Sequence, residues 1–373
     1  MSEVMSEIMS EIKEKKRLVF PDQARIIACI LVLLVHVSAL WLEREAVGSS
    51  ASFFALTGNI LAFTGVSLYV MISGALMLDP ERKTDAAYCV RKSLKLFGLW
   101  FLWKVLYRLS DMLEFILSGT AVSWKEDFFL NVFRKPGHYH LWFLPMIALI
   151  YLMVPLIKKG CEKKENCLLY IILFSLVSVL MPTIFLFDFP FRYLLEDFYR
   201  IFDFAYFAGY LGYFILGYYI LHHIDKKIPA GIGGLVCSAA LITFIIACVS
   251  AGKRSLTDGT VCELFSSPFT VHNLLISVTI FIIPKLVKTP EKAAVSGKGN
   301  KYLQLLSAST LGVYLIHPFI LDIIAGAGLF DIIGNVWLGM PLILLLLSLL
   351  SFAIILPVKA VYGIFRKSKS KEV

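Results

Sequence analysis

Long apolar runs separated by short polar segments fill the chain from about residue 24 onward. Each run is about as long as the roughly 20 residues that an α-helix needs to cross the hydrocarbon layer of a bilayer. Ten such runs predict helices near residues 24–43, 53–78, 93–117, 141–157, 168–187, 203–221, 230–250, 269–287, 303–325 and 336–362. The pattern predicts an all-α fold, a polytopic membrane helix bundle of about ten transmembrane helices.

The composition agrees with a membrane protein. Of the 373 residues, 58% are hydrophobic, and the mean hydropathy is +0.77. Soluble domains are usually only about half apolar. The net charge of +9 would suggest an acidic partner in a soluble protein, but here the loops between apolar runs carry most of it. We therefore expect the lipid bilayer as a partner and no nucleic acid.

The distribution of Lys and Arg over alternate loops predicts the topology. One set of loops holds 23 of these residues and the other set holds eight. Loops rich in Lys and Arg stay in the cytoplasm, so both termini are predicted there, which requires an even number of spans. The predicted regions are a cytoplasmic tail at 1–22, a transmembrane domain at 23–364 and a cytoplasmic tail at 365–373. We expect a multi-pass protein of the inner or plasma membrane.

The N-terminal tail repeats Met-Ser-Glu three times over its first 17 residues and carries no cleavage site of a signal peptide. Two interpretations stay open, a frayed cytoplasmic tail or a helix on the inner leaflet. The seven cysteines are scattered without a CxxC pair, and His138-x-His140 has no evident third ligand. We expect no metal site and no bound cofactor.

The first apolar run contains an arginine, Arg25, and a histidine, His36. Eleven residues turn an α-helix by three turns plus about 20°, so both side chains share one face, about 16 Å apart. Asp22 lies one turn before Arg25 and would orient it. Taken singly, Arg25 could extend to the interface and His36 could bond a neighbouring helix. Together on one face they indicate a functional site.

The order of Arg25 and His36 along the helix indicates phosphate binding at one end and proton transfer at the other. An arginine at the cytoplasmic mouth suits a ligand that carries phosphate. A histidine deeper on the same face suits proton transfer near neutral pH. Arg25 could bind the phosphate of a carrier that enters from the cytoplasm, and His36 could then react with the other end of that carrier inside the membrane.

Arg25-x10-His36 resembles the signature of the acyltransferase-3 family, which are integral-membrane O-acyltransferases. Three further stretches agree with this family: "SLYVMISGALML" (67–78), "YHLWFLPMIALIYLMVPLI" (139–157) and "STLGVYLIHPFIL" (309–321). Together they span most of the chain, and ten spans is the family's count. The "YHLWFLP" segment is closest to the subgroup that includes an O-acetyltransferase of enterobacterial common antigen.

The resemblance implies a reaction and roles for several residues. Acetyl-CoA, or another acyl-CoA, would donate its acyl group from the cytoplasm to a hydroxyl of a cell-envelope saccharide or lipid-linked sugar. Arg25 and Asp22 would hold the nucleotide end of CoA, with Arg91 and Ser73 also on the donor side. His36 would be the general base or accept the acyl group transiently, and the residues do not separate these routes. Acetyl-CoA would be a substrate rather than a cofactor.

Other polar residues have two interpretations each. Lys104, Arg108 and Asp111 share one face of the third run, either in an ion-pair network with residues such as Asp203 or in contact with the acceptor. Arg91 follows the positive-inside rule or binds a CoA phosphate.

Three residues nearer the predicted outer side also have two interpretations. His140 and Trp142 either lie at the membrane interface or, as the resemblance implies, shape the acceptor end of the site. His317, beside Pro318, either fixes a helix break or lines the cavity.

The alternative function is a secondary transporter, with His36, Lys104 and Arg108 as a proton or anion path. Transporters commonly show internal repeats with broken helices, and no clear repeat is visible between the halves of this sequence. A weaker alternative is the unrelated membrane-bound O-acyltransferase family, from which the Arg25–His36 pair in the first run distinguishes the chain. Walker A, HExxH and GxSxG motifs are missing from the sequence. The oligomeric state is not predicted.

Overall fold

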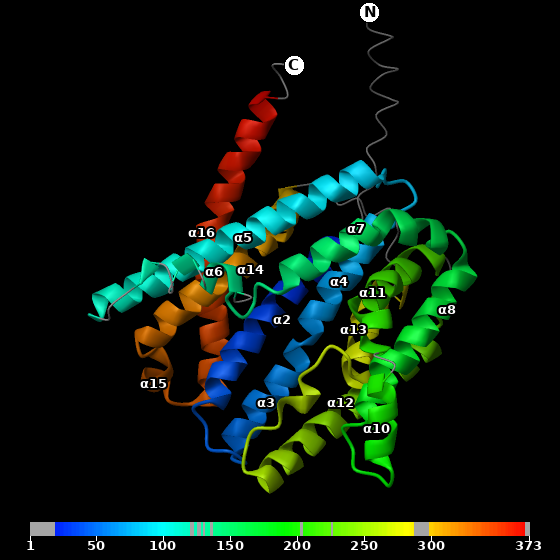
Figure 1. Cartoon of the computed structure of the whole chain (residues 1–373), viewed down its shortest axis with the longest axis horizontal. Helices are drawn as coiled ribbons and strands as arrows, with labels where there is room; N and C mark the ends of the chain where they lie inside the picture. Colours follow the sequence, from blue (N-terminus) through cyan, green and yellow to red (C-terminus); the bar gives the residue numbers. More distant parts are fainter. Residues whose placement is uncertain are drawn as a thin grey trace, which may run out of the picture. The chain divides into compact units, whose positions relative to one another are not determined.

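The computed structural model describes residues 19–119, 123–124, 128–129, 131–134, 137–201, 204–224, 227–286 and 298–369. Within these residues the regular structure is helical and contains no strand, which confirms the predicted all-α class (Figure 1). The N-terminal repeat and Asp203 lie outside the described residues.

The chain divides into two compact units. Unit 1 comprises Met1–Gly65, Lys226–Ser266 and Leu275–Val373, and unit 2 comprises Val66–Asp225 and Ser267–Leu274. The helices of unit 1 are α2 (Phe20–Leu42), α3 (Ser50–Ala62), α12 (Ala230–Asp258), α14 (Lys298–Gly326), α15 (Leu329–Ile333) and α16 (Val336–Lys369). Those of unit 2 are α5 (Ala86–Leu117), α6 (Asn131–Arg134), α7 (Phe143–Cys161), α8 (Lys164–Phe174), α9 (Met181–Ile184), α10 (Arg192–Ile201) and α11 (Phe204–Tyr218). Two helices, α4 (Thr64–Met77) and α13 (Val271–Leu286), contain a unit boundary.

Among the described residues, seven helical stretches are long and apolar enough to cross a membrane: Phe20–Leu42, Ser50–Met77 (α3 with α4), Phe143–Cys161, Lys164–Ile184 (α8 to α9), Ala230–Asp258, Tyr302–Gly326 and Val336–Lys359. They confirm a membrane protein. The other three predicted runs are also helical, but α5 carries seven charged residues, α11 has 15 residues and α13 has 16. The count of ten spans and the cytoplasmic termini stay predictions.

The starts of several helices follow from local sequence. Pro21 lies in the first turn of α2, where its missing N–H costs nothing. Ser49 caps α3 by accepting a hydrogen bond from the Ser52 amide at 3.0 Å. Asp85 caps α5 in the same way, with the Tyr88 amide at 2.7 Å. These caps fix where the chain leaves a loop and enters the long helices.

The core of unit 1 is built on α2, which contacts α3, α14 and α16. Near the middle of α2, Asn59 of α3 donates one hydrogen bond to the Val35 carbonyl and another to Ser38 Oγ, at 3.2 and 3.0 Å. Near its end, Trp41 is buried against Phe330. These contacts hold the segment that carries His36.

Two glycines allow two helices of unit 2 to touch. A Cβ on Gly74 of α4 would lie 1.8 Å from the Phe214 carbonyl oxygen, and one on Gly217 would lie 2.1 Å from the Met71 carbonyl oxygen. Small residues permit such close backbone approach in membrane helix pairs. The close packing of α4 against α11 therefore explains why a glycine follows Ser73.

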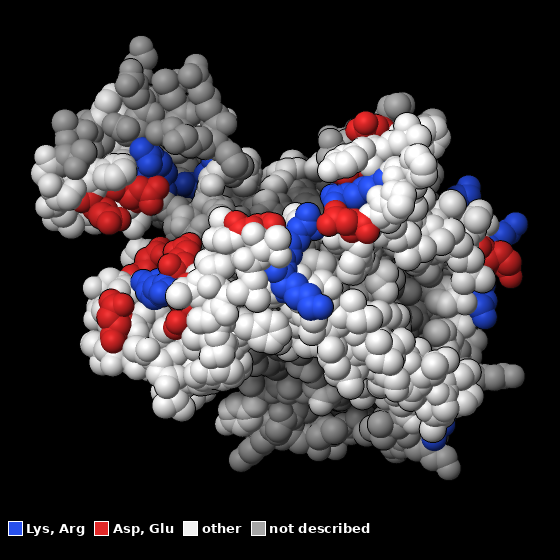
Figure 2. All heavy atoms as spheres, turned by 90° about the horizontal axis from the view of Figure 1, so that it is seen from below, with Lys and Arg blue, Asp and Glu red and all other residues white. Residues whose placement is uncertain are grey.

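Charged side chains occupy a small part of one face of the molecule (Figure 2). On the face shown in Figure 2, most of the surface belongs to uncharged residues. Many large apolar side chains are exposed on the helices, among them Leu156, Leu235 and Leu241. Soluble monomers rarely expose such large apolar areas, so these surfaces suit contact with lipid.

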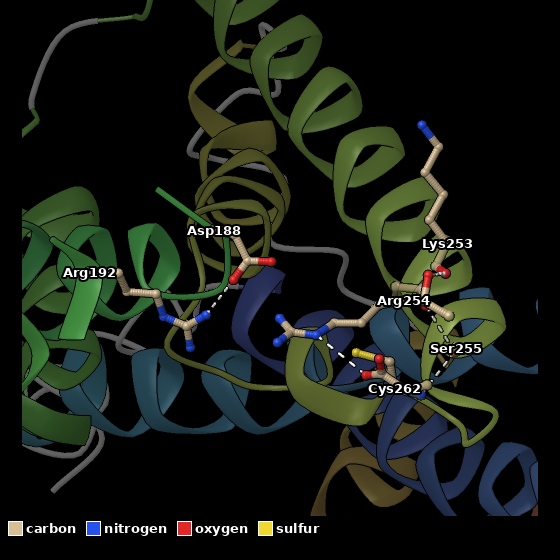
Figure 3. A network of polar contacts seen from close by, with 9 residues as sticks. Asp188, Arg192, Lys253, Arg254, Ser255 and Cys262 are labelled. Atoms are coloured by element: carbon tan, nitrogen blue, oxygen red, sulfur yellow. Dashed lines mark hydrogen bonds and ion pairs between the residues drawn. The ribbon is translucent and has the colours of Figure 1, made fainter. Parts of the chain in front are cut away.

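Several charged side chains form ion pairs with near neighbours in the sequence (Figure 3). In unit 2, Arg192 forms an ion pair with Asp188 at 2.8 Å. In unit 1, at the end of α12, Arg254 lies 3.6 Å from Asp258, and the neighbouring Ser255 Oγ accepts a hydrogen bond from the Cys262 amide. Exposed pairs of this kind contribute little to stability.

Candidate active site

Helices α2 and α14 of unit 1 run side by side and in the same direction. Three contacts join them in order along both helices: Asp22 with Ser307, Cys29 with Thr310, and His36 with His317. Because the partners advance together, the helices are parallel. The residues on α2 are seven positions apart, so they form one stripe along the helix that faces α14.

Asp22 and Arg25 form the charged end of this stripe. The Asp22 side chain is almost fully buried, and its Oδ1 accepts a hydrogen bond from Ser307 Oγ at 2.7 Å. Arg25 Nη1 lies 3.5 Å from the same oxygen. Asp22 and Arg25 therefore form an ion pair across one turn of α2. The Arg25 side chain keeps 29% exposure, so part of it is open to a ligand.

His36 lies against a second histidine. The rings of His36 and His317 are stacked, with centroids 5.0 Å apart and planes inclined by 28°. His317 is fully buried, and its Nδ1 is 2.7 Å from the Tyr314 carbonyl oxygen. His317 was expected to fix a helix break or to line the cavity, and the structure places it directly beside the predicted catalytic histidine.

A cavity of about 310 Å³ lies within unit 2. It is lined by Lys104, Tyr107, Arg108, Asp111, Val132, Gly137, His138 and Tyr139. Lys104 is buried, and its ammonium lies 4.7 Å from the centre of the Trp100 ring. Arg108 Nη1 lies 3.4 Å from Asp111 Oδ2. Lys104 and Arg108 are cationic and Asp111 is a carboxylate, so the described lining carries a net positive charge.

His138 and His140 form a coupled pair beside this cavity. Their Nδ1 atoms are 3.0 Å apart, so one ring donates and the other accepts. Burial lowers the pKa of His138 to about 4, and its ring is neutral near neutral pH. His140 itself is buried against the Tyr107 ring. The described residues contain no group of three His, Cys, Asp or Glu side chains placed to hold a metal ion.

The remaining predicted residues, Ser73, Arg91 and Trp142, also lie in unit 2. Arg91 is exposed, and its Nε donates to the Ala87 carbonyl of its own helix. Ser73 is half-buried beside the Gly74 crossing. Trp142 is partly exposed, and its ring packs on Tyr210 with centroids 5.5 Å apart. Each prediction of a role for these residues stays a prediction.

Unit 2 also contains a buried polar group that the sequence did not predict. His272 Nε2 lies 3.1 Å from Thr270 Oγ1, and Ser67 Oγ donates to Asn273 Oδ1 at 2.8 Å. All four side chains are buried. An isolated histidine at the start of an apolar run was the only sequence signal for this group.

His222 and His223 follow directly on the apolar run predicted near 203–221. They end the π-helical segment Tyr219–His223. His222 Nε2 donates to the Ala75 carbonyl, and His223 Nε2 donates to the Cys161 carbonyl. They therefore hold the ends of α4 and α7, a role that a pair of adjacent histidines does not reveal.

Comparison with known proteins identifies the family. Residues 18–359 match the acyltransferase-3 family model, described as an acyltransferase domain. No curated protein matches the chain, and no solved structure matches it. The matched range contains both α2 and α14, and hence Arg25, His36 and His317. Because the match covers nearly the whole sequence, the chain belongs to the acyltransferase-3 family of membrane acyltransferases.

Proposed function

We propose that the protein transfers an acetyl or other acyl group from cytoplasmic acyl-CoA to a hydroxyl of a cell-envelope saccharide or lipid-linked sugar. It would act in the inner or plasma membrane. Family membership supports acyl transfer in the membrane. The acyl-CoA donor and the reacting group are proposed from one observation, the stripe on α2. On it, an arginine that contacts Asp22 lies eleven residues before a histidine.

The donor would bind by its phosphates. A guanidinium donates to phosphate oxygens in a fixed, often bidentate geometry, and the buried Asp22 restrains the direction of Arg25. About 16 Å of helix separate Arg25 from His36. An extended CoA chain lying along α2 would then bring its thioester towards His36. The exposed Arg91 is a further candidate for the CoA phosphates.

His36 would react at the thioester. As a general base, it takes the proton of the acceptor hydroxyl while the oxygen attacks the thioester carbon and the CoA thiolate leaves and is then protonated. As a nucleophile, its ring nitrogen attacks the same carbon, and the acyl-imidazole then passes the acyl group to the hydroxyl. Both routes release CoA and form one ester.

The cavity of unit 2 supports a particular kind of acceptor. Its volume of about 310 Å³ is at the lower end for ligand sites, which suits about one sugar ring. Lys104 and Arg108 would bind a carboxylate or phosphate on that sugar, and His140 and Trp142 would shape the surroundings. The acceptor would therefore be an acidic saccharide. For the alternative function, a secondary transporter, the support consists of the charged residues alone.

The donor site is tested by thermal unfolding of the detergent-purified protein. A ligand that binds the folded state raises the unfolding midpoint by mass action, so no acceptor is needed. We expect millimolar CoA and acetyl-CoA to raise the midpoint of the wild type, and Arg25→Ala to lose this rise. Arg44→Ala, two residues beyond the other end of the same helix, is the matched control and keeps it. A well-folded wild type with no rise for either ligand would remove acyl-CoA from the proposal.

The acceptor site is tested by binding of simple sugars. We expect glucuronate to raise the unfolding midpoint of the wild type more than glucose does at equal concentration. Lys104→Met keeps the length of the side chain but loses its charge, so the difference should disappear. Lys95→Met changes an exposed lysine of the same helix and should preserve it. Equal responses to the two sugars in the wild type would reject an acidic acceptor, and inorganic phosphate tests whether the anion alone is sufficient.

A further inference from the structure

Helix α14 continues through a proline directly after His317. Pro318 lies inside the helix and has no N–H. In an α-helix that N–H would bond the carbonyl four residues earlier, which is the carbonyl of Tyr314. The proline therefore removes the regular helical donor from the Tyr314 oxygen, inside a segment where lipid and protein replace water.

His317 supplies a replacement donor. Its Nδ1 lies 2.7 Å from the Tyr314 oxygen. A carbonyl oxygen can only accept, so Nδ1 must carry a proton. A neutral imidazole has one N–H, and therefore Nε2 of His317 carries the lone pair. The sequence Tyr-x-x-His-Pro thus selects one tautomer and fixes the plane of the ring.

The His36 ring packs against the ring of His317. His317 is fully buried, and its ring stacks on that of His36 with centroids 5.0 Å apart. Asn59 holds the backbone of the same segment of α2 through the Val35 carbonyl and Ser38. The backbone and the ring of His36 are therefore restrained by different neighbours.

We propose that Tyr314, His317 and Pro318 form a positioning device that holds the His36 imidazole in its reactive orientation. His317 is a positioning residue in this proposal and does not itself touch the reacting atoms. The kinetic consequence rests on the proposed role of His36, whereas the tautomer of His317 rests on the geometry alone. A loosened orientation should lower turnover without changing the affinity for acyl-CoA.

Pro318→Ala is the informative variant, because it returns an N–H to Tyr314 that competes with His317. Nitrogen-15 NMR of histidine-labelled protein reads the tautomer directly. We expect the Nδ1–H form of His317 in the wild type and a mixture in Pro318→Ala, with a changed signal of His36. Turnover should fall about tenfold, the value of one hydrogen bond, at unchanged KM for acyl-CoA. Pro341→Ala, within a helix of the same unit, should change neither quantity.

His317→Phe gives a second measurement, since it keeps a stacked ring but loses the bond to Tyr314. It should also lower turnover, while His317→Asn, which can still donate to that carbonyl, should recover part of it. An Nε2–H or charged His317 in the wild type would overturn the proposal, as would a Pro318→Ala protein with unchanged His36 signal and turnover. If the wild type transfers no acyl group, the proposed function fails, and the NMR result alone decides whether the device exists.

Discussion

Replacing His36 with glutamine is expected to lower the turnover of acyl transfer by about 10²–10⁴-fold, the usual contribution of a general acid–base group. Glutamine has a similar polar end but cannot take the hydroxyl proton or form an acyl intermediate. Donor binding should survive, because Arg25 lies about three turns from His36 on α2 and Asp22 about four turns. The measurement is the initial rate of acetyl transfer in membranes that contain the acceptor, with CoA-dependent thermal stabilisation measured in parallel.

The matched control is His223→Gln. His223 donates to the Cys161 carbonyl in unit 2, and a glutamine amide can make the same bond. This variant should keep most of the turnover. A His36→Gln protein with turnover close to that of the wild type would reject both chemical routes through His36. A single turnover without acceptor separates the routes, since only the nucleophilic one leaves the labelled acyl group on the protein.

The largest expected effect on stability comes from Gly74→Val. A Cβ at Gly74 would lie 1.8 Å from the Phe214 carbonyl oxygen, far inside van der Waals contact with backbone that cannot rotate away. The helices α4 and α11 would have to separate, and Gly217, which touches Met71, would lose its close contact as well. Overpacking of this kind typically costs about 1–3 kcal/mol and more where backbone must move. The unfolding midpoint and the monodisperse fraction after purification should both fall sharply.

Gly98→Val controls for the general cost of a β-branched side chain in a membrane helix. Gly98 lies in α5, and a Cβ there would meet no atom within 4 Å. We expect its unfolding midpoint to stay close to that of the wild type. Equal midpoints for the two variants would show that α4 and α11 are not held in close contact.

The positions of the helices could be predicted because apolar length is a local property. The first apolar run, at 24–43, corresponds to α2 at Phe20–Leu42, and the last, at 336–362, to α16 at Val336–Lys369. The N-terminal difference at α2 has a local reason, since Pro21 and Asp22 are favourable in a first turn. Breaks within the helical runs were harder to predict from the sequence. The predicted run at 53–78 is divided into α3 and α4, and the short α10 was not predicted.

The site could be predicted only where its residues share one helix. Arg25 and His36 are related by helical geometry, and Asp22 reaches Arg25 across one turn. The stacking of His36 on His317 joins residues that are far apart in sequence, and only the packing of α2 on α14 reveals it. The same holds for the unit 2 cavity, whose wall includes Gly137 and His138 from the segment before α7.

In the proposed function, acyl groups pass from acyl-CoA to a saccharide hydroxyl with His36 at the reacting centre. The most direct measurement follows carbon-14 from the acetyl group of acetyl-CoA in membranes that contain the wild type or His36→Gln. We predict label in the saccharide fraction as an ester that mild alkali releases as acetate, present with the wild type and nearly absent with the variant. Label that stays in acetyl-CoA, or that reaches the saccharide equally with both proteins, would contradict this proposal.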